Sequence, residues 1–534
     1  MDIKERTQYI TKIKCLSGYV FAASFVLFSI HQIIWPYGCK TLVVTSVTSL
    51  ICGKLIYNRT INYVKDEFKS KWKIILYGLA SFFIEHDEYV MKIKKIEALG
   101  FQKEWSIFYS KLSYIVTGFF LTFVIACVTK KAKNYITELW RLTEKKERYI
   151  ATGYFVLIIF IAGYLYATNP NWYLQFGNGL YSVDSGWIVA QLYPKMTYYD
   201  IRHPIIGILF APIYSVLNGF ISLIMPTNII EVMSLFLMQA IFIFMLCLVG
   251  VMLRNMTNEI GVLYLWLASF PFMLYSFAPE KYQMCLFFFV IYLYAIQRNN
   301  HTGLYAYVIS TGMLPTNIWT IIFQLFREGS LKEKIKGFFF LCVTGVATIV
   351  CLGRVQLLNI NTLLREVDAM GMFRVRTYSV QEQLYSLINM IYCCIFPASS
   401  HVDDNFGMIW NNVTENAVPI VWIVFIVVVI GTLCSLKNNF YRVCFIYVIF
   451  AYILFGPLNW ATYESPLFSI LFSWAVIPLF VRGIAVVAPL FNIDASKFIK
   501  LLSIILLTMN IAMLLVMNDY LKGIVSEDCS LYDF

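Results

Sequence analysis

The chain has 534 residues, of which 59% are hydrophobic, 17% aromatic and only 14% charged. Soluble globular proteins carry about 25% charged residues and the mean hydropathy here is +0.69, so the composition excludes a soluble enzyme with one membrane anchor. The apolar runs are continuous rather than alternating, which excludes an outer-membrane β-barrel. We therefore expect an all-α, polytopic integral membrane protein.

The formal net charge of +11 does not indicate nucleic-acid binding, because Lys and Arg stand in short clusters beside apolar runs. That pattern is typical of residues that set membrane orientation. The 13 cysteines lie mostly inside apolar runs and form no CxxC motif, so neither a disulfide scaffold nor a zinc site is expected. Residues 1–14 are charged and precede a long apolar run without a cleavage site, which predicts a retained first helix.

A membrane-spanning helix needs about 20 mostly apolar residues. In residues 1–148 this rule predicts an N-terminal accessory region with four segments, the third of them short. Two charged stretches, 66–73 and 130–148, are expected to lie as helices on the membrane surface. The four predicted segments are 16–36, 41–57, 73–84 and 113–128.

Residues 149–518 are expected to form the transmembrane core, followed by an extracytoplasmic tail over 519–534. Leu314 and Pro315 interrupt the run 303–326, which predicts two short helices that enter the membrane and return. The predicted core segments are 149–168, 204–224, 229–253, 258–277, 281–298, 303–326, 336–353, 418–436, 440–458, 466–482 and 499–518.

The positions of the basic residues predict the orientation. With a cytoplasmic N-terminus and a segment 204–224 that dips into the membrane without crossing, roughly two thirds of the 42 Lys and Arg face the cytoplasm. If 204–224 crosses fully, the share falls to little more than half. The first arrangement is favoured, and it makes the loops 169–203 and 354–417 both extracytoplasmic.

The loop 169–203 is rich in glycine and aromatic residues, and Asp184 is the first charged residue after Arg148. A carboxylate at the membrane boundary is costly unless it is solvated or paired, so it marks a candidate site. A solvated loop aspartate is the alternative interpretation. Farther on, Asp200, Arg202 and His203 precede Pro204, where Asp200 could equally cap a helix or pair with Arg202.

This combination resembles the GT-C superfamily of membrane glycosyltransferases, which includes protein O-mannosyltransferases and lipid A aminoarabinose transferases. Asp184 matches the acidic position near the outer surface, and Arg202-His203-Pro204 looks like the His-Pro segment, although no second proline follows. Glu280 and Lys281 occupy a later extracytoplasmic turn where relatives often place a polar residue. The broken run 303–326 and the long late loop also resemble that fold.

The resemblance implies an inverting transfer of a sugar from a polyprenyl-phosphate donor to an extracytoplasmic hydroxyl, at the cell membrane. The acceptor would be a cell-envelope glycan, a glycolipid or a protein. Asp184 would be the general base. A cation would hold the leaving phosphate, and membrane lipid would surround the donor. The expected substrate-binding residues are Asp200, Arg202, His203, Glu280, Lys281, Arg374 and Arg376.

Arg374 and Arg376 would share one side of an extended segment, but an ordinary basic loop or a lipid-headgroup contact explains them equally well. A divalent metal, Mg²⁺ or Mn²⁺, remains open. Asp184 together with Asp200 or Glu280 could bind one, and the stretch 401–405 also gathers oxygen and nitrogen ligands.

Two other functions compete. A polysaccharide polymerase or O-antigen ligase would depend on the loop 354–417 with Arg374, Arg376 and His401 rather than on Asp184. A lipid or sugar transporter would be expected to carry charge at mid-helix and internal repeats. The long charge-free stretches and the lack of a convincing repeat argue against it.

Overall fold

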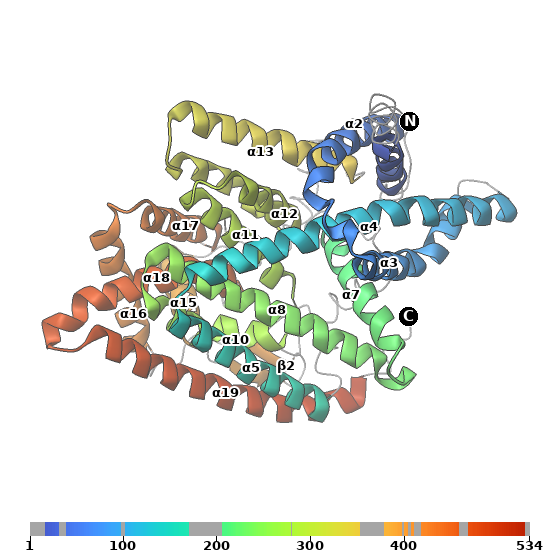
Figure 1. Cartoon of the computed structure of the whole chain (residues 1–534). Helices are drawn as coiled ribbons and strands as arrows, with labels where there is room; N and C mark the ends of the chain where they lie inside the picture. The colour runs from blue at the N-terminus through green and yellow to red at the C-terminus, as the bar shows by residue number, and fades with distance from the viewer. Residues whose placement is uncertain are drawn as a thin grey trace. The chain divides into compact units, whose positions relative to one another are not determined.

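The computed structural model describes residues 17–30, 39–97, 102–169, 205–278, 280–352, 379–397, 400–403, 407–410, 418–455, 457–458 and 468–528. Apart from one short β-ribbon, the regular structure of these residues is helical (Figure 1). Eight of their helices are long and apolar enough to cross a membrane, or nine if one bent pair counts as a single span. For this part of the chain the expected helical, multi-pass architecture is confirmed.

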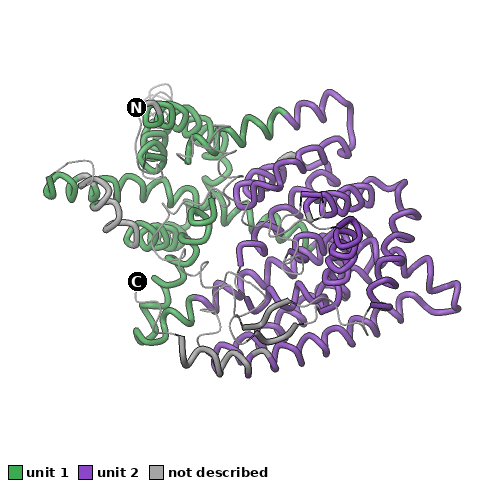
Figure 2. The backbone as a smooth tube through the Cα atoms, turned by 180° about the vertical axis from the view of Figure 1, so that it is seen from behind, with its two compact units in different colours: residues 1–140, 191–234, 339–366 green, residues 141–190, 235–338, 367–534 purple. Residues whose placement is uncertain are grey.

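The backbone forms two compact units (Figure 2). Unit 1 comprises residues 1–140, 191–234 and 339–366, and unit 2 comprises residues 141–190, 235–338 and 367–534. Unit 2 starts close to the expected domain boundary at residue 148, but unit 1 also takes in two later segments of the chain.

Aromatic packing forms the core of unit 1. The rings of Phe21 and Phe123 lie 4.8 Å apart, and those of Phe25 and Phe120 lie 5.0 Å apart. Such pairs contribute about 0.5–1.5 kcal/mol beyond area burial. Its elements are a helix over Ser17–Ile30, α2 (Cys39–Val64), η1 (Glu67–Lys69), α3 (Lys71–Glu97), α4 (Lys103–Leu142, up to residue 140) and α7 (Ile206–Ser222).

Helix α4 corrects one expectation. A spanning segment at 113–128 followed by a separate surface helix from 130 was predicted, but one continuous helix runs from Lys103 to Leu142. The physical reason is that no proline stands in this stretch and its one glycine, Gly118, lies well before the charged part. Helix α3 covers the short predicted segment 73–84, but it is not among the eight candidate spans.

Helix α18 is the buried centre of unit 2. Its Trp474 contacts Phe289 and Tyr447, with ring centroids 5.2 and 4.9 Å away. The helices of unit 2 are α5 (Lys145–Thr168), α8 (Thr227–Thr257, from residue 235), α9 (Ile260–Ala268), α10 (Phe270–Phe277), α11 (Lys281–Gln297), η3 (His301–Leu304), α12 (Tyr305–Met313), η4 (Pro315–Phe326), α13 (Leu331–Cys351, up to residue 338), α15 (Val380–Cys393), α16 (Val418–Ser435), α17 (Asn439–Phe455), α18 (Ser469–Val487), η9 (Ala488–Phe491) and α19 (Ala495–Asp528).

The late segment 354–417 is expected to be a loop, but the structure shows that it also contains regular elements. It contains α15, whose last turn is buried against the start of α18 through a Cys394 Sγ hydrogen bond to the Ser469 carbonyl. It also contains an antiparallel ribbon of β1 (Ser400–Asp403) and β2 (Gly407–Trp410), in which His401 pairs with Ile409. Part of the proposed outer loop therefore belongs to the helical bundle.

Two other expectations concern helix ends. The break at Leu314 is confirmed, because α12 ends at Met313 and η4 begins at Pro315. The segment expected as a tail from 519 begins inside α19, which continues to Asp528. No proline interrupts the chain between Ala495 and Asp528, so nothing ends the helix where the apolar run stops.

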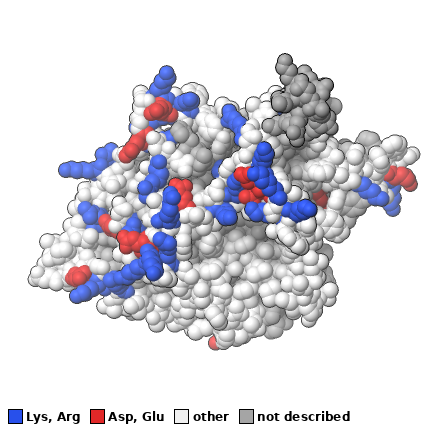
Figure 3. All heavy atoms as spheres, viewed as in Figure 1, with Lys and Arg blue, Asp and Glu red and all other residues white. Residues whose placement is uncertain are grey.

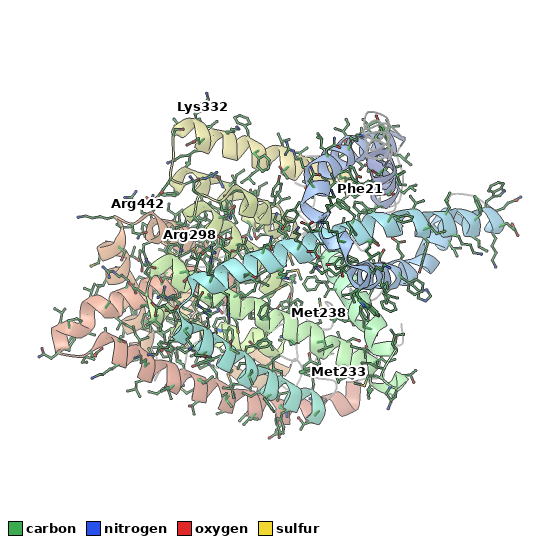
Figure 4. All side chains as sticks on the ribbon, in the orientation of Figure 1. Phe21, Met233, Met238, Arg298, Lys332 and Arg442 are labelled. Carbon is green, nitrogen blue, oxygen red and sulfur yellow. The ribbon has the colours of Figure 1, made fainter. Side chains whose placement is uncertain are left out.

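Several of the turns between helices of unit 2 lie together at one end of the unit, which we call the charged end. Figure 3 shows coloured side chains gathered near these turns, while the flank along α19 is almost entirely white. Arg298, Lys332 and Arg442 mark the ends of α11, α13 and α17 (Figure 4). The connecting bonds are Arg254 Nε to Glu147 Oε1 (2.5 Å), Gln297 Nε2 to the Met256 carbonyl (2.9 Å), Arg327 Nε to Asn299 Oδ1 (2.5 Å), Asn439 Nδ2 to the Phe326 carbonyl (3.4 Å) and Tyr441 OH to Glu259 Oε1 (3.4 Å).

Helices α5 and α8 run antiparallel and are joined at both ends. Glu147 of α5 binds Arg254 of α8 at the charged end, whereas the rings of Tyr166 and Phe236 lie 5.7 Å apart at the other. The chain therefore leaves α5 and enters α8 at the same end of unit 2. The segment 204–224, on which the expected orientation depends, contains α7, a helix of 17 residues.

Candidate functional site

Of the expected catalytic and substrate-binding residues, two lie in the described part of the chain, Glu280 and Lys281. They occupy the turn between α10 and α11. The others fall outside the described residues, namely Asp184, Asp200, Arg202, His203, Arg374 and Arg376.

Glu280 and Lys281 form a buried ion pair. The Lys281 ammonium lies 3.1 Å from Glu280 Oε1, and the two side chains are only 4% and 1% exposed. The ammonium also lies 4.9 Å from the centre of the Tyr282 ring, within cation–π range. Because an isolated buried charge is very costly, each of the two charges depends on compensation from its partner.

The local sequence explains why Glu280 takes this position. Glu280 is the N-cap of α11, and its Oε1 accepts a hydrogen bond from the Lys281 amide at 2.9 Å. In return, Gln283 Oε1 accepts from the Glu280 amide at 2.9 Å. This reciprocal arrangement is a capping box, in which a residue at the cap and one three positions later satisfy each other's backbone.

Two buried glutamines hold the end of α10 against this turn. Gln283 Nε2 donates to the carbonyls of Tyr275 and Ala278, at 2.7 and 2.8 Å, and Gln239 Nε2 of α8 also donates to the Tyr275 carbonyl, at 3.0 Å. The last carbonyls of a helix have no partner within it, so these amides supply the missing donors. The turn is therefore fixed from two directions.

The helix that leads to this turn is broken. Helices α9 and α10 meet at Ser269 with a bend of 49°. Asn510 Nδ2 of α19 donates to the Ala268 carbonyl at 2.9 Å, and the Phe270 amide donates to the Ile395 carbonyl at 3.1 Å. Pro271, which has no amide hydrogen, stands in the first turn of α10, where a helix tolerates proline.

The ion pair lies at the end of unit 2 opposite the charged end. Tyr282 contacts Phe468 at the start of α18, with ring centroids 5.7 Å apart. Thr168 at the end of α5 accepts a hydrogen bond from Asn518 Nδ2 at 3.2 Å. The end of α5 that leads into the loop of Asp184 and the turn of Glu280 therefore share this end of unit 2.

Chemically, the turn offers an ammonium group and a carboxylate in an apolar, aromatic surround. Lysine is a compact point charge that can bind phosphate oxygens, and a carboxylate next to it can fix its position. Among the residues that the structure describes, no three His, Cys, Asp or Glu side chains gather closely enough to hold a metal ion.

The sequence did not predict the two glutamines that hold the turn, Gln239 and Gln283, or the buried part of α15. Gln239 and Gln283 lie inside apolar helices and looked like isolated polar residues. Helix α15 could have been found, because Ser379 and Glu382 form a capping box directly before an apolar stripe at helical spacing. Burial of the Glu280–Lys281 pair has no sequence signal, since it depends on α8 and α18.

Comparisons with known proteins give no further support for any assignment. The chain matches no protein-family model, no curated protein and no solved structure.

Proposed function

We propose that the chain is an integral-membrane, inverting glycosyltransferase that moves a sugar from a polyprenyl-phosphate donor to an extracytoplasmic acceptor hydroxyl. The observation that carries the proposal is the buried Glu280–Lys281 pair at the end of unit 2 from which the loop of Asp184 begins. Multi-pass helical structure and the opposite placement of the charged end are consistent with it.

In this mechanism Asp184 removes the proton from the acceptor hydroxyl. The acceptor oxygen then attacks the anomeric carbon from the face opposite the phosphate, and the bond from that carbon to the phosphate oxygen breaks. The lipid phosphate leaves with the bonding electrons and gains negative charge. Preorganised cations stabilise such charge most effectively where water is limited.

Lys281 is the proposed phosphate-binding cation, and Glu280 is a positioning residue for it. The remaining expected contacts to donor or acceptor are Asp200, Arg202, His203, Arg374 and Arg376. Whether Mg²⁺ or Mn²⁺ takes part is tested by adding a chelator to the assay.

The test is a transfer assay with purified full-length protein in lipid nanodiscs and a panel of polyprenyl-phosphate sugars. Asp184→Asn is expected to lower kcat by about 10²- to 10⁴-fold, the range for loss of a general base. Lys281→Met is expected to lower kcat as well, and Lys281→Arg to keep part of it. Lys497→Met, at the charged end, is the matched control and should keep full activity.

Three outcomes contradict the proposal. Full activity of Asp184→Asn with loss of activity in Arg374→Ala would favour the polymerase or ligase alternative. Movement of a lipid-linked sugar across the bilayer without transfer would favour a transporter. The broken pair α9–α10 is the observation that favours this alternative, because transporters bind substrates at discontinuous helices. The third outcome combines two results. If both Lys281 variants fail to fold, as judged from their melting curves, and Glu280→Gln keeps full activity, then the pair has a structural role only.

A further inference from the structure

A second surface of unit 2 combines positive charge with exposed apolar groups. Lys145, Lys146, Tyr149 and Ile150, all in the first two turns of α5, line an open cavity of about 560 Å³. It lies at the charged end, far along α5 from the Thr168 end and thus from the proposed catalytic site.

The two lysines at this cavity keep their charge available. Both neighbouring carboxylates, Glu144 and Glu147, bind Arg254 instead, at 3.2 and 2.5 Å. In the part of the chain that the structure describes, neither Lys145 nor Lys146 has an acidic partner within 4 Å, and Lys145 Nζ lies 5.9 Å from the centre of the Tyr149 ring. The cavity therefore attracts an anion.

An exposed apolar stripe continues from the cavity along α5. Tyr149, Val156, Phe160 and Tyr164 are 66%, 46%, 74% and 54% exposed. Their successive spacings of seven, four and four residues place them on one helix face. Gly153 lies within this stripe, and a Cβ at its position would meet no atom within 4 Å, so the stripe has a notch.

We propose that this surface binds one anionic glycerophospholipid. The headgroup phosphate would lie between the ammonium groups of Lys145 and Lys146, and an acyl chain would follow the stripe over the notch at Gly153. The argument for a lipid rather than a soluble anion is continuity. The cationic cavity opens directly onto the exposed apolar side of a candidate membrane span. One lipid molecule can therefore place its phosphate in the cavity and its acyl chain on that side.

The test measures lipid binding to the purified full-length protein in detergent by native mass spectrometry and by melting temperature. The ligands are phosphatidylglycerol, phosphatidylcholine and inorganic phosphate. Phosphatidylglycerol is expected to bind and stabilise, and the double variant Lys145→Gln/Lys146→Gln to weaken its binding about tenfold or more. Gly153→Leu, which fills the notch and keeps both charges, is expected to weaken it severalfold.

The matched control is Lys497→Gln/Lys500→Gln. It removes the same charge from the first turns of α19, also at the start of a candidate span, where Asp494 lies 4.0 Å from Lys497. It should leave the affinity within twofold of the wild type. An equal loss in the control would mean diffuse charge attraction, and inorganic phosphate that competes at low concentration would mean a free-anion site. Equal binding of both lipids would also overturn the proposal. None of these outcomes depends on sugar transfer.

Discussion

The ion pairs of Arg254 join α8 to the start of α5. Arg254 binds two carboxylates that differ sharply in environment, since the Glu147 side chain is 1% exposed and the Glu144 side chain 69% exposed. The same guanidinium therefore makes one buried and one surface ion pair. The energetic weight of the two pairs should differ accordingly.

Replacing Arg254 with Gln is expected to destabilise the protein by about 3–5 kcal/mol, because the buried Glu147 carboxylate would lose its compensating charge. Glu144→Gln is expected to cost less than about 1 kcal/mol, since exposed pairs contribute little. Unfolding of both variants in detergent, followed by denaturant titration, measures the difference. Equal losses would contradict the assigned difference between the two pairs.

Glu259, in the turn between α8 and α9, predicts a pH dependence. Burial raises the pKa of this carboxyl above its usual value of 4.5, and the nearby Arg482 guanidinium and Tyr441 hydroxyl offset only part of that. The folded state therefore binds more protons than the unfolded state just above pH 4.5. The contribution of Glu259 to stability is largest at low pH and falls as the pH rises through this window.

We expect the stability of the wild type relative to Glu259→Gln to decrease as the pH rises from 4.5 toward neutral. The variant keeps an oxygen that can accept the Tyr441 hydrogen bond, and it removes both the titration and the charge that lies 3.6 Å from the Arg482 guanidinium. Melting temperatures of both proteins across the pH series test this. A relative stability that increases with pH would show that the sign is wrong.

At the scale of elements, close helix packing depends on small residues. Helices α16 and α18 cross where Gly431 faces the Leu479 carbonyl and Gly483 faces the Val427 carbonyl. A Cβ at Gly431 would lie 1.9 Å from that oxygen, and one at Gly483 2.0 Å from its counterpart. Lipid tails are as apolar as the helices, so membrane helices associate through close van der Waals packing, which small residues permit.

Gly431→Ala and Gly483→Ala are each expected to force α16 and α18 apart and to lower the melting temperature by several degrees, since overpacking costs about 1–3 kcal/mol or more. Gly345→Ala in α13 is the control, because a Cβ there meets nothing within 4 Å. It should leave stability unchanged or raise it slightly, since alanine favours a helix. Tolerance of both α16 and α18 substitutions would contradict the observed contact.

For the whole molecule, the two ends of unit 2 should face opposite sides of the membrane. The charged end gathers the turns rich in Lys and Arg, which favours a cytoplasmic location for it. The opposite end carries the Glu280–Lys281 pair and the start of the Asp184 loop. Sidedness therefore tests the proposed extracytoplasmic location of the reaction.

Single cysteines at Lys332, Arg442 and Asp184 test this with a membrane-impermeant maleimide on intact cells. Labelling of Asp184→Cys from outside, and of Lys332→Cys and Arg442→Cys only after permeabilisation, is expected. The wild type gives the background from its own cysteines, of which Cys342 and Cys434 are exposed. Labelling of all three positions from the same side would reject the proposed topology.

Most helices of this chain could be predicted from the sequence, because a membrane requires long apolar runs and a run of about 20 apolar residues is visible without any tertiary information. The breaks at Leu314 and between α9 and α10 differ in this respect. Pro315 predicts the break at Leu314 from the sequence. The break between α9 and α10 is stabilised by hydrogen bonds from Asn510 and to Ile395, which lie in distant parts of the chain.

By itself, the sequence determined the class of protein, the approximate spans and the charge asymmetry, because these depend on composition and on neighbours along the chain. Only the tertiary structure decided that Glu280 and Lys281 are buried together, that α15 joins the bundle, and that α16 and α18 touch through two glycines. These features depend on side chains that are remote in sequence. No local pattern encodes which of them will meet.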